Sequence, residues 1–349
     1  MVKWKAISDI VKRNKGISIT AGQMNELNSS GGNIRVFAAG QTIADIDETK
    51  LPKGCAHTKP SIIVKSRGYI DFEFYDKPFT HKNEMWSYSF DDLQICKFIY
   101  FYLTTKTEEF RKKARANSVK LPQLCVADTD NFIIPLPPNE EISRIVSKLD
   151  TFKDSIENLK RQIDQRRKQY FCYRDQIISL SLSNWPQKTL KDVAVIKNGK
   201  DYKNLSTGSV PVYGSGGIMT FVNRFASDKP SVLLPRKGSV ENIFYVDKPF
   251  WTVDTIYWTE IDTKKMEPKF LFYSLSKYDL KKYAYGGARP SLSQPILYKL
   301  EVPLPPLKEQ SRIISLLDTF EASISNLEAQ LEHRQKQYEY YRNKLLTFE

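Results

Sequence analysis

One segment of this chain occurs twice, and both copies open on the same proline-led run. The first copy begins at Pro135 as PLPPNEEISRIVSKLDTF, and the second begins at Pro303 as PLPPLKEQSRIISLLDTF. Aligned without gaps, residues 135–180 and 303–348 are identical at 24 of 46 positions. So much identity over this length indicates an internal duplication, and the fold must therefore contain the same unit twice.

Each copy also carries a regular hydrophobic seam. Mostly apolar and aromatic residues are spaced in alternating steps of four and three, from Ile145 to Leu180 in the first copy and from Ile313 to Phe348 in the second. This spacing over about five heptads predicts one long helix per copy, packed along its seam. At about 1.5 Å per residue, a helix of roughly 40 residues is on the order of 60 Å long.

The prolines mark where each helix starts. Because proline cannot continue a helix or a central strand, the runs 135–138 and 303–306 are predicted to be stiff elbows ahead of the helices. Asn139 is the predicted N-cap of the first helix, and Glu140 and Glu141 suit the positive end of its dipole.

One arginine falls on the seam in each copy, Arg166 in the first and Arg334 in the second. Their stems can pack in the seam while the guanidinium groups reach solvent. Alternatively, the two arginines fix the register of the helices or contact a binding partner. The second interpretation makes them candidate partner-binding residues.

The order of these segments predicts the domain organisation. Globular region 1–134 precedes helical segment 135–184, and globular region 185–302 precedes helical segment 303–349. If the helices pair antiparallel, each globular region lies at the start of its own helix and the halves are related by a pseudo-two-fold axis. We therefore predict an α/β (α+β) chain with two similar globular domains separated by two long antiparallel coiled-coil helices.

The two globular regions share short motifs in the same order. KPSIIVKSRG at 59–68 corresponds to KPSVLLPRKG at 229–238, and DKPF occurs at both Asp76 and Asp247. Short β-branched and aromatic runs between glycine and proline turns predict strands, so each region is expected to be a small α/β domain.

The loops of the two regions differ, and many are basic. FRKKARANSVKLPQ at 110–123 stands opposite KKYAYGGARPSLSQ at 281–294, and the chain has a formal net charge of +13. Lysine and arginine set against phosphates release condensed counterions, and arginine can also fork onto guanine in the major groove. A basic run can equally be a solvated helix end. The candidate DNA-binding residues are Lys65, Arg67, Arg111, Lys112, Lys113, Arg115, Lys200, Ser215, Arg236, Lys237, Lys282, Tyr285 and Arg289.

Motifs for catalysis are missing from the sequence. There is no phosphate-binding G-x-x-x-x-G-K-[ST] loop and no G-x-G-x-x-G dinucleotide motif. The three histidines stand beside no promising nucleophile, and the four cysteines are scattered without a C-x-x-C pair. We therefore expect a non-catalytic chain with no metal site.

The N-terminal stretch MVKWKAISDIVKRNK has no apolar core of signal-peptide length, and no run approaches about 18 uncharged apolar residues. A cytoplasmic protein without a membrane partner is expected.

Taken together, the pattern resembles the specificity subunit of Type I restriction-modification systems. Two variable globular domains alternate with two similar long helices, announced by PLPPxxEIxRIxxxLD and PLPPxxEQxRIxxxLD. The resemblance covers essentially the whole chain. The first copy has NEEIS where the second has LKEQS, a change expected to be harmless.

The resemblance implies target-recognition domains at 1–134 and 185–302, each reading half of a bipartite site in double-stranded DNA. It further implies that the helices act as a spacer and dock two methyltransferase subunits, which restriction subunits join. S-adenosylmethionine, ATP and Mg would be used by those partners and not bound by this chain. The alternative is a coiled-coil adaptor that joins two protein partners without binding DNA.

Overall fold

The structure is a computed structural model that describes residues 1–118, 120–287 and 289–348, apart from the side chains of 181–183. Two units are distinguished within it. The first unit comprises Met1–Asn158 and Gln330–Glu349, and the second comprises Leu159–Ala329. Each predicted globular region lies within one unit, and each long helix contributes one part to each.

The first unit contains three small sheets. A two-stranded sheet pairs β1 (Lys3–Ala6) with β9 (Ile133–Leu136). A four-stranded sheet has the order β2 (Arg13–Asn14), β8 (Trp86–Ser89), β5 (Ser61–Lys65), β6 (Asp71–Tyr75). A three-stranded sheet has the order β4 (Ile43–Ile46), β3 (Ile34–Phe37), β7 (Phe79–His81). Its shorter α-helices are α1 (Ala21–Leu27), α2 (Leu93–Thr105), α3 (Thr107–Asn117) and α4 (Val126–Asp130).

The second unit repeats this topology strand for strand. In the two-stranded sheet, β10 (Gln187–Thr189) pairs with β18 (Glu301–Pro303). The four-stranded sheet has the order β11 (Ala194–Asn198), β17 (Ile256–Ile261), β14 (Ser231–Pro235), β15 (Phe244–Val246). The three-stranded sheet has the order β13 (Gly217–Val222), β12 (Thr207–Gly214), β16 (Trp251–Thr252). Its shorter helices are α6 (Leu190–Val193), α7 (Pro268–Ser276), the 3-10 helix η3 (Leu280–Tyr283) and α8 (Gln294–Leu297). The structure thus confirms that the two globular regions share one mixed α/β scaffold.

The hydrophobic core of each unit forms where a helix covers the four-stranded sheet. On β5, Ile62 and Val64 are buried in the same cluster as residues of α2, while Ile63 faces a separate cluster. On β14, Val232 and Leu234 are buried with residues of α7. This alternation is the two-residue period of a strand with both faces covered.

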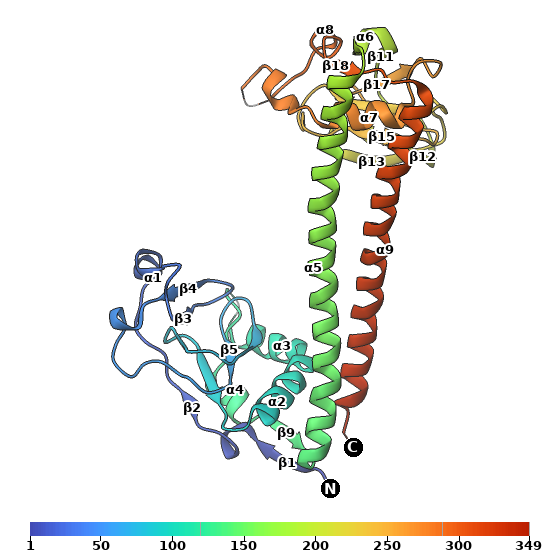
Figure 1. Cartoon of the computed structure of the whole chain (residues 1–349). Helices are drawn as coiled ribbons and strands as arrows, with labels where there is room; N and C mark the ends of the chain where they lie inside the picture. Colours follow the sequence, from blue (N-terminus) through green and yellow to red (C-terminus); the bar gives the residue numbers. More distant parts are fainter. Residues whose placement is uncertain (119, 288, 349) are drawn as a thin grey trace. The chain divides into compact units, whose positions relative to one another are not determined.

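The long helices are α5 (Asn139–Asn184) and α9 (Leu307–Leu345), of 46 and 39 residues. In each unit they lie side by side and run in opposite directions (Figure 1). In the first unit Phe152 stacks on Tyr341 at 5.4 Å between ring centres, and in the second unit Tyr173 lies 5.4 Å from Phe320. The duplicated seam residues therefore meet in pairs, which confirms the predicted antiparallel packing.

The start of α5 differs by one residue from the prediction. Asn139 is the first helical residue and not the N-cap, and the carbonyl oxygen of Pro138 accepts from the backbone amides of Glu141 and Ile142. The proline run also begins within a strand, because Pro135 pairs with Trp4 in the two-stranded sheet. Such a sheet has only edge strands, where a proline without an N–H is tolerated.

The departure between NEEIS and LKEQS is explained by two different buried environments. Ile142 is buried in the apolar core of the first unit. Gln310 is buried at the equivalent position of the second unit, where its Oε1 accepts from the Glu267 amide at 2.7 Å. Its Nε2 donates to the carbonyls of Lys265 and Pro305, both at 2.8 Å. Each residue is satisfied in its own setting.

A buried histidine ties β7 to β8 in the first unit. His81 Nδ1 lies 3.1 Å from the Lys82 carbonyl oxygen, so this nitrogen carries the proton and donates. Its Nε2, 3.1 Å from Ser87 Oγ, then accepts from that hydroxyl. Burial lowers the pKa of His81 from 6.5 to about 4.

Acidification is therefore expected to destabilise the first unit. Because the folded-state pKa of His81 lies below its unfolded value, the stabilisation is complete above pH 6.5 and is lost as the pH falls from 6.5 to about 4. The loss in free energy of unfolding should be at most about 3 kcal/mol. Urea unfolding of wild type and His81→Gln at pH 7 and 4.5 checks this. The variant should keep only the smaller slope from His57, whose pKa burial also lowers, and from carboxylates such as Glu141, whose pKa is lowered by its bond to Arg144. An equal pH slope in both proteins would contradict the assignment.

Candidate nucleic-acid interface

Two loops of the second unit form a short ladder. The Gly238 amide donates to the Pro290 carbonyl at 3.1 Å, and the Leu292 amide donates to the Arg236 carbonyl at 2.9 Å. Between these bonds, Lys237 and Ser291 face each other as an antiparallel bridge. Residues 236–238 and 290–292, which lie more than 50 positions apart in sequence, are therefore held together.

The turn between β12 and β13 joins this ladder. The amide of Ser215 donates to Thr255 Oγ1 at 3.3 Å, and the carbonyl of Thr255 accepts from the amides of Arg236 and Lys237. A Cβ on Gly238, whose φ is +86°, would meet Ser215 Oγ at 3.2 Å. Glycine, which has no Cβ, therefore allows both the positive φ and the close approach of the turn that contains Ser215.

The side chains of this cluster differ in how free they are. Arg236 is half-buried, donates to the Asp254 carbonyl at 3.3 Å and lies over the Tyr257 ring. Lys237 is exposed, with Asp254 Oδ2 at 4.0 Å. Tyr285 is 56% exposed, and its backbone pairs with Ser291.

Arg289 has the guanidinium or ammonium group with the fewest contacts in this cluster. It is exposed, and within the described part of the chain its guanidinium makes no hydrogen bond or ion pair. A free guanidinium beside backbone held close by glycine is the kind of group that can bind phosphate or a guanine edge.

The first unit builds the same ladder from different residues. The Gly68 amide, at a φ of +74°, donates to the Pro122 carbonyl at 2.8 Å, and the Leu124 amide donates to the Ser66 carbonyl at 2.8 Å. Arg67 faces Gln123 as Lys237 faces Ser291. Val119 and Ala288, within the two loops predicted to differ, lie outside the described residues.

Three of the basic residues predicted for the first unit are engaged within it. Lys65 Nζ lies 2.7 Å from Glu73 Oε2, and its side chain is only 12% exposed. Arg111 pairs with Glu108 at 2.5 Å and lies over the Tyr69 ring. Lys113 lies 3.3 Å from a carboxylate oxygen of α3 and over two phenylalanine rings. Their charges are therefore partly compensated.

The remaining predicted basic residues are exposed. Arg67, Lys112 and Arg115 are open to solvent in the first unit, and Arg115 lines a pocket with Arg111, Tyr69 and Gly68. Lys200 and Lys282 are exposed in the second unit, and Lys282 lies 3.7 Å from Asp279. The structure thus gathers Ser215, Arg236, Lys237, Tyr285 and Arg289 into one cluster and places Lys282 outside its ladder.

Sequence reasoning missed the residues that organise each ladder. Pro122 and Pro290 supply the acceptor carbonyls, and Gly68 and Gly238 supply the positive φ. The shared KPS motif aligns the two glycines, so that signal was available. Nothing local in the sequence indicates which distant carbonyl each glycine amide meets.

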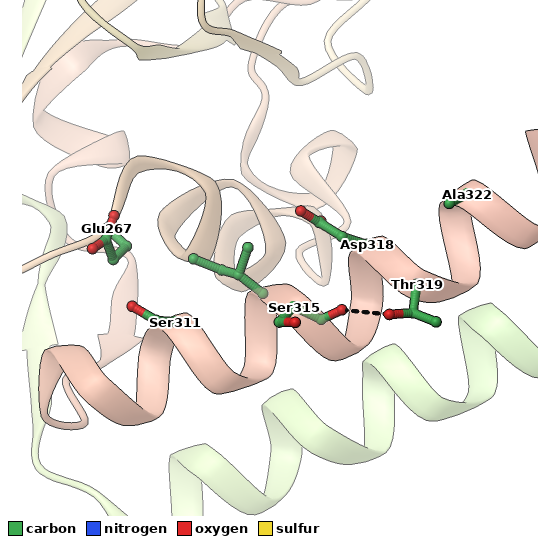
Figure 2. Close-up of a pocket in the computed structure, with 7 residues that line it drawn as sticks. Glu267, Ser311, Ser315, Asp318, Thr319 and Ala322 are labelled. Carbon is green, nitrogen blue, oxygen red and sulfur yellow. Dashed lines mark hydrogen bonds between the residues drawn. The ribbon is translucent and has the colours of Figure 1, made fainter.

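A shallow groove follows α9 in the second unit (Figure 2). Ser311, Ser315 and Thr319 line it, and Thr319 Oγ1 donates to the Ser315 carbonyl at 2.8 Å. The equivalent residues of α5 in the first unit are Ser143, Ser147 and Thr151, all exposed, and Thr151 Oγ1 donates to the Ser147 carbonyl at 2.8 Å. The same small, polar helix face is therefore present twice.

The seam arginines make equivalent contacts. Arg166 donates to Gln169 at 3.3 Å, and Arg334 donates to Gln337 at 3.1 Å. In the first unit the guanidinium of Arg334 also lies 5.7 Å from the centre of the Phe152 ring. These contacts favour packing of the two arginines within the helix pair, and their role in partner binding stays a prediction.

Within the described ranges, no three histidine, cysteine, aspartate or glutamate side chains come together to hold a metal ion. None of the described helices has the length and apolar character needed to cross a membrane.

Comparison with known proteins gives a consistent result. A family model described as the Type I restriction modification DNA specificity domain matches residues 1–166 and 182–334. The predicted type I restriction enzyme specificity subunit S.HindORF215P of Haemophilus influenzae is 30% identical over 289 residues, covering 72% of each chain. The EcoR124I/EcoR124II specificity subunit of Escherichia coli is 26% identical over 317 residues, covering 80% of this chain and 77% of its own.

Solved structures share the fold at lower sequence identity. The S subunit of a Type I restriction-modification system from M. genitalium superposes with a TM-score of 0.66 at 20% identity, over 100% of this chain and 97% of that one. A chain from a type I R-M complex has a TM-score of 0.57 at 14% identity, covering 99% and 96%.

Removing the Arg289 guanidinium is expected to weaken binding to duplex DNA. If Arg289 forks onto a guanine, Arg289→Ala should cost about 1–3 kcal/mol for the preferred sequence selected from a random duplex pool. If it contacts a phosphate, the loss should be similar for all sequences and the salt slope should fall by about one. Anisotropy titrations at several salt concentrations separate the two cases.

The exposed lysine of a turn outside the cluster supplies the control. Lys264→Ala removes an exposed positive charge outside the cluster, so this variant should bind DNA as wild type does. Unchanged binding by the double variant Lys237→Ala, Arg289→Ala would exclude the cluster from the interface.

Proposed function

Because the chain belongs to the Type I restriction-modification DNA specificity family, we propose that its two units are target-recognition domains that each read one half of a bipartite site in double-stranded DNA. The protein is the DNA specificity subunit of such a system and, as a member of this family, is non-catalytic. The observation that carries the proposal is the duplicated ladder, in which one backbone arrangement presents Arg67 in one unit and Lys237 in the other. One scaffold with two sets of exposed side chains suits a site with two different halves.

The ladder residues and the exposed side chains near them divide between positioning the DNA and reading its bases. The glycines let the backbone approach the phosphates closely, and the exposed lysines supply sequence-independent attraction. Arg289 and Tyr285 in the second unit, and Arg115 in the first, are the groups we assign to base edges or sugars. The alternative of an adaptor without DNA binding leaves the DNA specificity match over 1–166 and 182–334 unexplained.

Two methyltransferase subunits are proposed to dock on the repeated helix faces. Ser143, Ser147 and Thr151 on α5 are exposed as Ser311, Ser315 and Thr319 on α9 are, and the bond from Thr151 to the Ser147 carbonyl matches that from Thr319 to the Ser315 carbonyl. Small side chains allow a partner helix to approach closely, and a face repeated twice fits two copies of one partner. S-adenosylmethionine would enter with these subunits, and ATP and Mg with the restriction subunits.

Bulky charge on one helix face should block assembly there. Ser315→Arg or Ser147→Arg is expected to remove one methyltransferase from the complex, because the arginine stem fills the space that a partner would occupy. Sedimentation with purified methyltransferase measures stoichiometry, and labelled S-adenosylmethionine measures methyl transfer. The specificity subunit alone should transfer no methyl group, and transfer by it alone would contradict the proposal.

Gln335→Arg is the matched control for this experiment. Gln335 is exposed on α9 outside the groove, and the equivalent position of α5 is naturally Arg167. This variant should assemble as wild type does. Full stoichiometry in the double variant Ser147→Arg, Ser315→Arg would place the docking surface elsewhere.

The length of α5 and α9 is proposed to set the gap between the half-sites. Deleting 156–162 together with 324–330 removes one heptad from each helix and keeps the seam in phase. The helices shorten by roughly 10 Å, which is about three base pairs if they lie along the duplex. We expect unchanged half-site sequences with a spacer shorter by about one to three base pairs, read out by mapping methylated adenines. Active enzyme that keeps the original spacer would show that the helices do not measure distance.

A further inference from the structure

The two units differ sharply at one equivalent position of the scaffold. In the first unit, polar side chains on β2, β7 and β8 hydrogen-bond to one another there. Asn14 Nδ2 donates to Ser87 Oγ at 3.0 Å and to Ser89 Oγ at 2.6 Å. His81 bonds to the same Ser87 hydroxyl, and the His57 ring stacks on His81. The polar groups of this network therefore already have hydrogen-bond partners within the protein.

The equivalent residues follow from strand register and shared backbone bonds. Asn14 pairs with Ser87 as Lys197 pairs with Trp258. The Ile17 amide donates to the His81 carbonyl as the Lys200 amide donates to that of Thr252, both at 2.8 Å. His57 and Phe79 exchange backbone bonds as Ser227 and Phe250 do. The second unit therefore has Lys197, Trp258 and Thr252 where the first has Asn14, Ser87 and His81.

With these residues the second unit has an open pocket of about 450 Å³. Two indole rings line it in defined positions. Trp251 Nε1 donates to the Lys200 carbonyl at 2.9 Å, and Trp258 packs edge-on against Phe250 at 6.0 Å. Phe225, which is 52% exposed, also lines the pocket.

The polar groups of the pocket are incompletely used. Thr252 is 1% exposed, and its Oγ1 has no hydrogen-bond partner in the described chain. Lys200 is exposed, and no described acidic group pairs with its ammonium. Lys197 is held by Glu260 at 3.1 Å. A buried hydroxyl left unpaired costs free energy, which a ligand that bonds to it would recover.

We propose that this pocket of the second unit binds a nucleobase, stacked on Trp251 or Trp258, hydrogen-bonded to Thr252 and held through its phosphate by Lys200. Aromatic side chains stack on any base, and a lysine beside them suits the adjoining phosphate. At the equivalent positions of the described first unit, Asn14, Ser87 and His81 bond to one another instead.

A short segment of chain links the pocket to the recognition cluster. Thr252 is followed directly by the turn 253–255, and the Thr255 carbonyl accepts from the Arg236 and Lys237 amides. Residues 252–255 therefore connect the pocket to the cluster along the chain. The nucleobase can come from the bound DNA or from a free nucleotide. Only the first source rests on the proposed function.

The test uses the full chain and two kinds of probe. Calorimetry measures binding of dAMP, dGMP, dCMP and TMP, with deoxyribose 5-phosphate as the probe that lacks a base. Anisotropy measures a labelled duplex with one unpaired nucleotide against the same duplex with an unpaired abasic residue. Wild type should prefer the base-bearing probe in at least one pair by about fivefold or more, the range that stacking on an aromatic ring supplies.

Two variants and a matched control identify the pocket. Trp251→Leu and Thr252→Val should each remove the preference for the base-bearing probe. Thr80→Val should not, although it also replaces a buried threonine whose hydroxyl has no described partner, because it lies in the first unit. All three should bind an intact duplex within about twofold of wild type, which separates this site from the recognition cluster.

A preference confined to mononucleotides would assign the pocket to a free nucleotide, and one confined to the unpaired duplex would assign it to a displaced base. Either result supports the site. Equal binding of base-bearing and abasic probes by wild type, or a preference that survives in both variants, would overturn it. Loss of intact-duplex binding in the Arg289→Ala variant alone would bear on the proposed function and not on this pocket.

Discussion

The burial of each long helix against its own sheet-bearing domain underlies the rest of the structure. Leu149 of α5 and Leu317 of α9 are fully buried in the cores beneath α2 and α7. Full burial of one leucine is worth about 1.5–3 kcal/mol. The partly exposed ion pairs nearby, Lys97 with Asp150 and Lys269 with Asp318, both at 2.6 Å, contribute about 0–1 kcal/mol each. Apolar packing therefore fixes each helix to its domain, and the ion pairs orient it.

Duplication lets one scaffold carry unlike chemistry at equivalent positions. Lys153 in the first unit corresponds to Glu321 in the second. The Lys153 ammonium lies 5.0 Å from the centre of the Tyr100 ring, whereas Glu321 accepts from the hydroxyls of Tyr170 at 2.7 Å and Tyr273 at 3.1 Å. Each charged group therefore finds its partners within its own unit. The same divergence reaches the ladders and the pocket, where the backbone is shared and the exposed groups are not.

A basic composition does not translate directly into a basic surface. Lys65 and Arg111 are both strongly engaged by carboxylates of the first unit. Arg289 keeps its charge available in the second. Groups that bind phosphate must be free to exchange water for an anion, so the exposed and unpaired residues carry most of the attraction.

The sequence by itself determined the duplication, the two long helices and the seam that pairs them. These are local properties, because a 3-4 spacing specifies one helix face whatever surrounds it. The shared motifs at 59–68 and 229–238 likewise placed equivalent strands, and the helix start at Asn139 was wrong by only one residue.

Only the tertiary structure decided which residues meet. Ser215 touches the loop at Gly238, and Pro290 receives the Gly238 amide, because sheet order brings distant turns to one place. Whether Lys65 is free depends on Glu73 across a hairpin. The pocket beside Thr252 likewise depends on neighbouring strands, because Thr252 and Ser227 stand where the first unit has the larger His81 and His57. Hydrogen bonds between residues far apart in the chain set these positions, and no period in the sequence encodes them.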